Sequence, residues 1–328
     1  MVERLPLVSV ICLCYNQRDW VEAAVNSVLR QTYPNIELVI ADDGSTDGSQ
    51  DAIKQMHSRY PDIKIFLSDI NRGNCAAFNA AFRETRGAFV VDLAADDVMH
   101  PERIEKQVNK FSELDHTYGV VFTDADYIDS NGAFLYRHYD ALRRNRLITN
   151  VPEGDVFRDV LSRYFIATPT MLIRRSVLEA IGGYDETLAY EDFDFWVRSS
   201  RFFRYAFLNE PLTQIRRTGR SMSSDWYKRN DPKVHSTYVV CRKAMSLCRD
   251  DEDRAALIKR LRYEFRQCVL TGNRVEADHF LGLLRELREL SPSDRVFRII
   301  KNTGIPLGWL RNIYHTIRFR SPGTMHRL

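Results

Sequence analysis

The first half of the chain alternates short apolar runs with longer segments in which apolar residues recur every three or four positions. The short runs are rich in Val and Ile and are typical of strands buried in a parallel sheet, whereas the longer period indicates helices with one apolar face. The predicted strands cover residues 7–13, 36–41, 62–67, 88–93 and 120–123, and the predicted helices cover 20–31, 48–60, 74–85 and 101–114. This order predicts a mostly parallel sheet covered by helices.

The pattern is less regular after residue 123 and becomes helical towards the C-terminus. Residues 131–152 show no clear period and hold a cluster of arginines, so they are compatible both with a loop over a site and with a solvated helix. A strand is expected at 169–173, and a short helix at 176–181 ends at Gly182-Gly183. Periodicity predicts three further helices over residues 234–247, 254–270 and 275–290.

Residues 295–328 carry seven basic side chains and no acidic ones. Within this segment Trp309, Ile313 and Ile317 fall on one face of a predicted helix, opposite Arg311. A basic amphipathic helix suits the surface of an anionic membrane, and packing on the protein's own domain is the alternative. The predicted organisation is an α/β domain (1–230), a helical extension (231–294) and a basic amphipathic tail (295–328).

Composition narrows the functional classes. The formal net charge of +3 gives no overall case for nucleic-acid binding. The six cysteines show no Cys-x-x-Cys pair and no zinc-type Cys/His spacing, so we expect them reduced and buried, as in a cytosolic protein. No segment approaches the roughly 20 apolar residues of a membrane span, and the N-terminal apolar run lacks the features of a signal peptide. We therefore expect a cytoplasmic protein that the tail would bring to the cytoplasmic face of a membrane.

Two acidic pairs directly follow predicted strands, Asp42-Asp43 after the second and Asp96-Asp97 after the fourth. Ligands of open α/β sheets bind in the crevice beyond the carboxyl ends of the strands. Crowded carboxylates are unfavourable unless a cation or a ligand compensates them. One pair alone is better explained as the cap of the following helix, but two pairs at equivalent strand ends favour a site for a metal and a phosphorylated or nucleotide ligand.

The acidic pairs belong to a longer, ordered set of phrases. The set runs through Val8-Ser9-Val10-Ile11, Asp42-Asp43-Gly44-Ser45, Asn71-Arg72-Gly73, Asp96-Asp97 with Pro101, Gly182-Gly183-Tyr184-Asp185 and Glu191-Asp192. Over roughly residues 5–225 the chain resembles the family 2 glycosyltransferases. The resemblance implies the GT-A fold, a Rossmann-like, mostly parallel α/β sheet of nucleotide-diphospho-sugar transferases. It also implies inverting, metal-dependent transfer from a UDP- or dTDP-sugar to a hydroxyl of a saccharide or lipid-linked saccharide, as in cell-surface polysaccharide synthesis.

On the donor side, the resemblance implies a divalent metal, Mn²⁺ or Mg²⁺, bound by Asp97. Asp96 would share the metal or face the donor ribose. Asp43 would accept the imide N–H of uracil or thymine, which cytosine does not offer. Tyr15 would pack against the base, with ordinary core packing as its alternative.

On the acceptor side, the resemblance implies that Asp192 is the general base, which takes the proton of the attacking hydroxyl. Glu191 would orient Asp192 or contact the acceptor. Trp196 would stack on a sugar ring, with burial in the core as an equal alternative. Taken alone, the acidic phrase Glu191-Asp192-Phe193-Asp194 is better explained as the solvated start of a helix, where carboxylates favour the helix dipole.

The chain departs from the family pattern at three positions. Ala94 stands where many members have the first Asp of Asp-x-Asp-Asp, and Phe78 stands where many have Arg. Arg72 would then supply the basic contact to the donor. Thr218 replaces a His that can contact the metal or the diphosphate, so the phosphate charge would fall to Arg216, Arg217 or Arg220.

Two other functions fit parts of this pattern. A nucleotidyltransferase also uses acidic residues and a metal, but it would need a Gly-rich basic loop near the N-terminus, and residues 14–18 contain no glycine. A membrane-bound scaffold that keeps the fold but has lost transfer would explain Ala94, Phe78 and Thr218 equally well. The sugar, the acceptor, the linkage and the oligomeric state leave no signal in the sequence.

Overall fold

The computed structural model describes residues 5–218, 227–288, 290–303 and 307–309 of the 328-residue chain. Among the helices within those ranges, none combines the length and the apolar character that a bilayer crossing requires. Residues 310–328, which hold most of the predicted amphipathic face of the tail, lie outside the described part of the chain.

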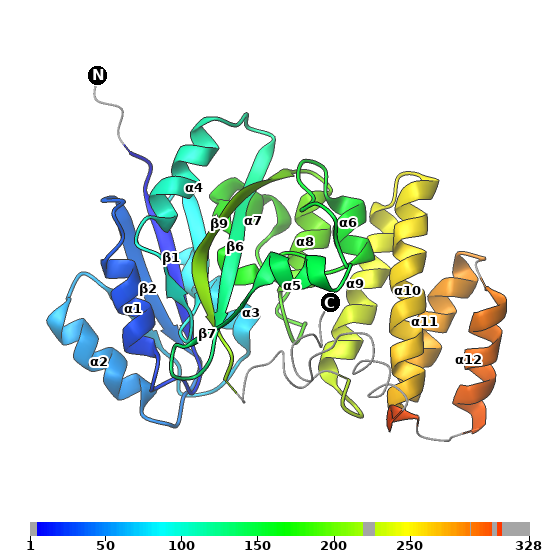
Figure 1. Ribbon diagram of the computed structural model, residues 1–328. Coiled ribbons are helices and arrows are strands. Elements are labelled where there is room, and N and C mark those ends of the chain that lie inside the picture. The colour runs from blue at the N-terminus through cyan, green and yellow to red at the C-terminus, as the bar shows by residue number, and fades with distance from the viewer. Residues whose placement is uncertain (1–4, 219–226, 289, 304–306, 310–328) are drawn as a thin grey trace.

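A single mixed, mostly parallel sheet forms the centre of the molecule (Figure 1). Its strand order is β3-β2-β1-β4-β8-β6-β9-β5, and β7 pairs with β6. The strands that share one direction are β1 (Val8–Cys14), β2 (Ile36–Asp42), β3 (Lys64–Leu67), β4 (Phe89–Ala94), β6 (Tyr118–Ile128) and β9 (Arg204–Arg216). The antiparallel ones are β5 (Val98–Met99), β7 (Phe134–Arg137) and β8 (Leu172–Arg174). The predicted α/β architecture is therefore confirmed.

Helices cover both faces of the sheet, so residues of β1 alternate between two apolar cores. Val10 and Cys12 join the core under α1 (Val21–Leu29), α2 (Ser49–Arg59) and α4 (Arg103–Ser112). Ile11 and Leu13 face the opposite core, which α3 (Asn74–Arg83) covers. This two-sided burial explains the continuous apolar runs of the strands. Five cysteines are buried and Cys248 is half-buried, all as free thiols.

The second half of the α/β region contains several short helices. They are α5 (His138–Arg144), α6 (Phe157–Ser162), α7 (Arg175–Ile181), α8 (Asp192–Ser200) and the 3₁₀ turn η1 (Thr168–Thr170). Residues 131–152 are thus neither a plain loop nor a solvated helix, although Tyr136, His138 and Ala141 do line the cavity described below. They contain β7 and α5, and α5 buries Tyr139 and Leu142 in the core. Because two short elements of different period follow each other there, no single period is visible in the sequence.

The C-terminal helices are confirmed as α9 (Pro232–Leu247), α10 (Asp251–Thr271) and α11 (Arg274–Glu286), and the structure adds α12 (Pro292–Thr303). They stack at the end of the molecule opposite α2 (Figure 1). Their apolar faces belong to the same core as α3, α6 and α8. The division of the chain near residues 230 and 294 remains a prediction, and α12 runs across the second boundary.

A buried polar network connects the extension to the α/β region. Arg260 of α10 donates from Nε to the carbonyl oxygen of Leu161 at 3.0 Å, and from a terminal nitrogen to Glu264 at 3.2 Å. Its guanidinium carbon lies 4.1 Å from the ring centroid of Tyr164. Glu264 also accepts from the Tyr227 hydroxyl at 2.6 Å. These contacts satisfy most of the buried charge of Arg260 and hold the ring of Tyr164 in place.

Candidate active site

One cavity of about 810 Å³ opens at the carboxyl edge of the parallel strands. Tyr15 follows β1, Asp43 follows β2, Asp96 and Asp97 follow β4, and Arg217 follows β9. The start of α8 forms the opposite wall. Of the residues predicted for the site, those that line this cavity are Tyr15, Asp43, Asp96, Asp97, Glu191, Asp192 and Trp196. The structure therefore brings together carboxylates that are up to about 150 residues apart in the sequence, as the strand-end rule predicts.

Asp43 fixes the loop that precedes α3. Its two carboxylate oxygens accept from the backbone N–H groups of Arg72 and Gly73, each at 2.8 Å. Gly44 makes this approach possible, because it adopts a φ of +76° and a Cβ there would lie 2.6 Å from the backbone of Asn71. The side chain of Arg72 is exposed and is not among the residues that line the cavity. Its predicted contact with the donor therefore remains a prediction.

The first acidic pair thus divides its tasks. Asp42 accepts from the backbone N–H of Ser45 at 2.9 Å and from the side chain of Gln50 at 2.8 Å. It organises the turn after β2 and does not line the cavity. Asp42 is thus not a helix cap, since the N-cap of α2 is Gly48 and makes no side-chain cap hydrogen bond, while Asp43 lies on the cavity wall.

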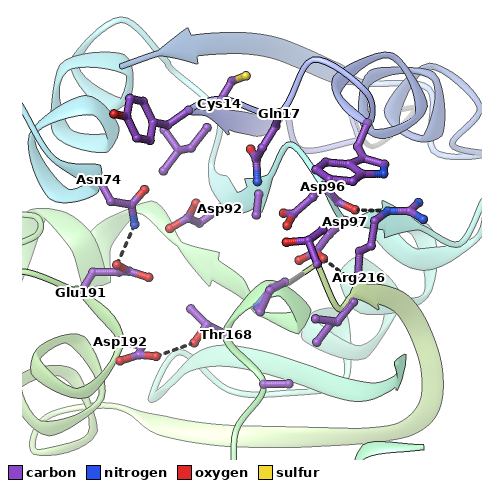
Figure 2. A pocket seen from close by; sticks show the side chains of 18 of the residues that line it. Cys14, Gln17, Asn74, Asp92, Asp96, Asp97, Thr168, Glu191, Asp192 and Arg216 are labelled. Atoms are coloured by element: carbon purple, nitrogen blue, oxygen red, sulfur yellow. Dashed lines mark hydrogen bonds between the residues drawn. The ribbon is translucent and has the colours of Figure 1, made fainter. Parts of the chain in front are cut away.

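The second pair lies in the turn directly after β4. Asp97 accepts from the backbone N–H of Arg216 at 2.9 Å, and the Arg216 side chain donates to the carbonyl oxygen of Asp96 at 3.0 Å (Figure 2). Burial raises the pKa of Asp97 well above its usual range, and the charge of Asp96 raises it further. Burial also raises the pKa of Asp96. Two crowded, desolvated carboxylates of this kind are what a bound cation compensates.

The third pair starts α8 from the opposite wall. Glu191 accepts from the side chain of Asn74 at 2.7 Å, and Asp192 accepts from the hydroxyl of Thr168 at 3.3 Å (Figure 2). Asp192 is buried, as is Asp194, which pairs with Arg198 on the same helix. The phrase is therefore not a solvated helix start: two of its carboxylates line the cavity and one lies in an internal ion pair.

The two aromatic residues predicted for the site differ in exposure. Tyr15 is 49% exposed at the cavity, so it is not a core residue. Trp196 is only 2% exposed and belongs to the core, although one part of it lines the cavity. Its indole nitrogen is buried without a hydrogen-bond partner in the part of the chain that the structure describes.

Of the three arginines considered for the phosphate charge, Arg217 has the most suitable position for binding it. Its guanidinium stacks over the ring of Tyr127 at 4.6 Å and donates to the hydroxyl of Tyr136 at 3.2 Å. Arg216 directs its side chain to the carbonyl oxygens of Asp96, Asp129 and Ser130. Arg220 lies outside the described residues.

Sequence reasoning missed Asp92, Asn74 and Thr168, all of which line the cavity. Asp92 lies on the same face of β4 as Ala94, because side chains alternate along a strand. It is 8% exposed, and burial together with the charge of Glu191 raises its pKa to about 8. The signal in the sequence was a lone carboxylate two positions before the Ala that replaces a family Asp.

A mixed sheet of this order, with an acidic cavity at its carboxyl edge, defines the class of GT-A glycosyltransferases. The family model "Glycosyl transferase family 2" matches residues 9–182, more than half of the chain, and the chain belongs to this family. The predicted resemblance and fold class are both confirmed.

Relatives by sequence agree with this family. An uncharacterized glycosyltransferase of Rickettsia prowazekii is 31% identical over 212 residues, which are 64% of this chain and 64% of that protein. The chain thus spans less than two thirds of that relative. TuaG of Bacillus subtilis, whose name assigns it to teichuronic acid biosynthesis, is 30% identical over 225 residues, 68% of this chain and 84% of TuaG.

Solved structures show the same fold at low sequence identity. Residues 1–349 of S. aureus TarS in complex with UDP-GlcNAc superpose with a TM-score of 0.64 at 17% identity, covering 95% of this chain and 91% of that one. The mannosyltransferase PcManGT of Pyrobaculum calidifontis, in complex with GDP-Man and Mn²⁺, superposes with a TM-score of 0.59 at 18% identity, covering 95% and 88%.

Proposed function

We propose that this protein is an inverting, metal-dependent glycosyltransferase. It moves a sugar from a UDP- or dTDP-sugar to a hydroxyl of a saccharide or lipid-linked saccharide, as in cell-surface polysaccharide synthesis. One observation carries the proposal: the same cavity holds a pair of carboxylates suited to a cation, Asp96 and Asp97, and a separate carboxylate suited to a general base, Asp192.

The carboxylates of the site fit a divalent cation that has few protein ligands. Among the described residues no group of three or more His, Cys, Asp or Glu is arranged to hold a metal. Mg²⁺ is commonly held by one or two carboxylates together with substrate phosphates, and Asp96 and Asp97 meet that requirement. When bound, Mn²⁺ or Mg²⁺ would stabilise the negative charge of the departing diphosphate. Arg217 adds a fixed positive charge on the cavity wall.

The bond changes follow from the positions of the two groups. Asp192 accepts the proton of the acceptor hydroxyl while that oxygen attacks the anomeric carbon. The bond between the anomeric carbon and the diphosphate oxygen breaks, and the nucleoside diphosphate leaves with the electron pair. Attack from the side opposite the leaving group inverts the configuration. Thr168 holds the Asp192 carboxylate in place through its hydroxyl.

Recognition of the two substrates uses opposite walls. Asp43 and Tyr15 would contact the nucleobase, and Glu191 and Trp196 would contact the acceptor. The relationship to TuaG supports a polysaccharide acceptor, and the UDP-GlcNAc complex of TarS supports a uridine nucleotide.

Two substitutions test the assignment of cation and base. Asp192→Asn is expected to reduce transfer by at least about 100-fold, since general-base catalysis contributes about 10² to 10⁴, while UDP still binds. Asp97→Ala is expected to weaken Mn²⁺-dependent UDP binding in calorimetry. Hydrolysis of UDP-sugars in the presence of Mn²⁺ by the unmodified protein distinguishes an enzyme from an inactive scaffold. Near-normal turnover of Asp192→Asn would remove the base from the mechanism.

The proposal includes a peripheral contact with an anionic membrane. On α12 the aliphatic side chains Val296 and Ile299 are 54% and 63% exposed, and the exposed Arg295 and Arg298 lie beside them. The one acidic residue of this helix, Asp294, is buried against Arg262. Exposed aliphatic and basic groups on one helix favour binding to an anionic lipid surface.

Flotation with vesicles tests this contact. The intact protein is expected to float with vesicles that contain phosphatidylglycerol and not with pure phosphatidylcholine. The double variant Val296→Ser/Ile299→Ser should float less. Val275→Ser is the matched control, because Val275 is 62% exposed on α11. Equal flotation with both vesicle types would exclude the electrostatic contribution.

A further inference from the structure

Asp92 is a cavity residue to which the proposed reaction assigns no role. Its carboxylate oxygen Oδ2 accepts from the hydroxyl of Tyr184 at 3.0 Å. The other oxygen, Oδ1, has no hydrogen-bond partner among the residues that the structure describes. The residue is nevertheless 92% buried and lines the cavity. Oδ1 is not fully enclosed by protein and faces the cavity, so a ligand bound there could supply its missing polar partner.

Tyr184, the partner of Asp92, is itself held in place by several contacts. Tyr184 stacks on Phe78 with the ring centroids 4.2 Å apart. Its backbone N–H donates to Asn79 at 2.9 Å, and its carbonyl oxygen accepts from Asn79 at 2.8 Å. Phe78 is the residue that replaces the Arg of many family members. Here it supports Tyr184, and through it Asp92.

The position of Asp92 identifies the part of the ligand that it would meet. In Figure 2 it lies between the Asp96-Asp97 pair on one side and Glu191 on the other, with Asp192 beyond. If the proposed function holds, the diphosphate lies by Asp96 and Asp97 and the attacking hydroxyl lies by Asp192. The anomeric carbon is bonded to the first and attacked by the second. The sugar of the donor must therefore lie between them, over Asp92.

We propose that Asp92, with Glu191 beside it, binds hydroxyl groups of the donor sugar and makes the site select neutral sugars over uronic acids. This inference rests on the proposed function and deepens it. Ala94, on the same face of β4, presents only a methyl group and leaves Asp92 accessible. The charge of Glu191 at this place would repel the carboxylate of a uronic acid, because like charges in a desolvated site are strongly unfavourable.

The pKa of Asp92 agrees with this assignment. Since it is raised to about 8, mainly by burial and then by the charge of Glu191, the carboxyl carries a proton over much of the neutral range. With Oδ2 occupied by Tyr184, that proton is available on Oδ1 for a sugar oxygen. An Asn at this position would offer the same pair of groups, an acceptor for Tyr184 and an N–H for the sugar.

The test compares donors that differ only in the sugar, using UDP-glucose, UDP-galactose, UDP-GlcNAc and UDP-glucuronic acid with Mn²⁺, and UDP alone as the probe without a sugar. The wild type is expected to hydrolyse at least one neutral donor. Its kcat/KM for UDP-glucuronic acid should be at least about 10-fold lower than for that donor. Asp92→Ala should lower kcat/KM for the neutral donor by about 10-fold or more, the size expected for a hydrogen bond to an ionisable group. The Kd of UDP should stay within about twofold.

Two further variants separate binding from folding. Asp92→Asn is expected to retain donor kcat/KM within a few-fold, and Tyr184→Phe to lower it by less than Asp92→Ala. Asp124→Asn is the matched control, because Asp124 is a buried strand aspartate that does not line the cavity. Equal weakening of UDP and UDP-sugar by Asp92→Ala, unchanged donor kcat/KM, or efficient use of UDP-glucuronic acid would each overturn the inference. Failure of the wild type to use any of these UDP-sugars or the corresponding dTDP-sugars would instead overturn the proposed function.

Discussion

At the scale of single residues, the aspartates of this protein differ by their surroundings more than by their place in a motif. Asp42 and Asp43 are neighbours, yet one organises a turn and the other lies on the cavity wall. The strand-end pairs could be predicted, because each follows an apolar run directly. Asp92 could not, because it lies within such a run and its partner Tyr184 is 92 positions later in the chain.

The titration of Asp92 predicts how stability depends on pH. Its pKa is raised from 3.8 to about 8 in the folded protein, so the folded state retains a proton that the unfolded chain has released. The free energy of unfolding contributed by this group is therefore highest below pH 4 and is lost as the pH rises towards 8. Asp92→Asn removes this dependence. Denaturant unfolding without ligand should show that the unfolding free energy of Asp92→Asn increases relative to that of the wild type from pH 5 to pH 8.

The comparison is made at equal ionic strength, so that screening of the neighbouring charge on Glu191 does not change. A difference in unfolding free energy that is the same at pH 5 and pH 8 would show that Asp92 titrates normally.

At the scale of elements, the sequence predicted those with one strong period and missed those whose polar residues are buried. In β9 the apolar alternation is interrupted at Asn209-Glu210-Pro211, where the pairing with β6 also shifts register. In α8 most residues, polar ones included, are buried, so no exposed face marks it as a helix. Contacts with residues elsewhere in the chain determine the secondary structure of both β9 and α8.

The turn after α7 predicts a difference between two adjacent glycines. Both have positive φ, +74° at Gly182 and +76° at Gly183. A Cβ at Gly182 would meet no atom within 4 Å, whereas one at Gly183 would lie 2.6 Å from the side-chain oxygen of Asn79. Gly182→Ala should cost about 1 kcal/mol of unfolding free energy, and Gly183→Ala clearly more. Chemical denaturation measures both, and equal losses would contradict the contact.

Lys243 predicts the strength of the connection between α9 and α8. Its ammonium group donates to Asp185 at 2.6 Å and to the buried Asp194 at 2.7 Å. Lys243→Met should lower the unfolding free energy by about 1–3 kcal/mol near pH 7, because a buried carboxylate loses a charged partner. Lys259→Met, at an exposed position of α10, is the control and should change it by less than about 0.5 kcal/mol.

The same pair has a defined dependence on pH. Burial would raise the pKa of Asp185, but hydrogen bonds from Lys243 and Thr187 outweigh it and lower the pKa to about 2. A lowered carboxyl pKa stabilises the folded state above the ordinary value and loses that effect as the pH falls towards 2. The difference between wild type and Lys243→Met should therefore shrink between pH 4 and pH 2, and a constant difference would contradict the pairing.

At the scale of the whole molecule, the helical extension is not packed as a separate body. One apolar core contains Phe193 of α8 together with Leu257 and Phe265 of α10. The periods of the C-terminal helices were readable in the sequence, but their shared core was not, because an apolar face does not reveal what covers it.

A continuous core predicts a single cooperative unfolding transition. Phe265→Ala should lower the unfolding free energy by about 3–5 kcal/mol and shift the entire calorimetric transition, because the cavity it leaves lies in the shared core. Val275→Ala, at an exposed position of α11, serves as the control. Two resolved transitions, of which only one responds to Phe265→Ala, would show that the extension unfolds independently.

The stacking of Arg260 on Tyr164 has a consequence for protein engineering. Tyr164 lines the cavity and Arg260 belongs to the extension, so the wall of the pocket and the C-terminal helices must be exchanged together. A chimera that joins this α/β region to the C-terminal helices of a relative would also need that relative's counterparts of residues 157–164 and 193–196.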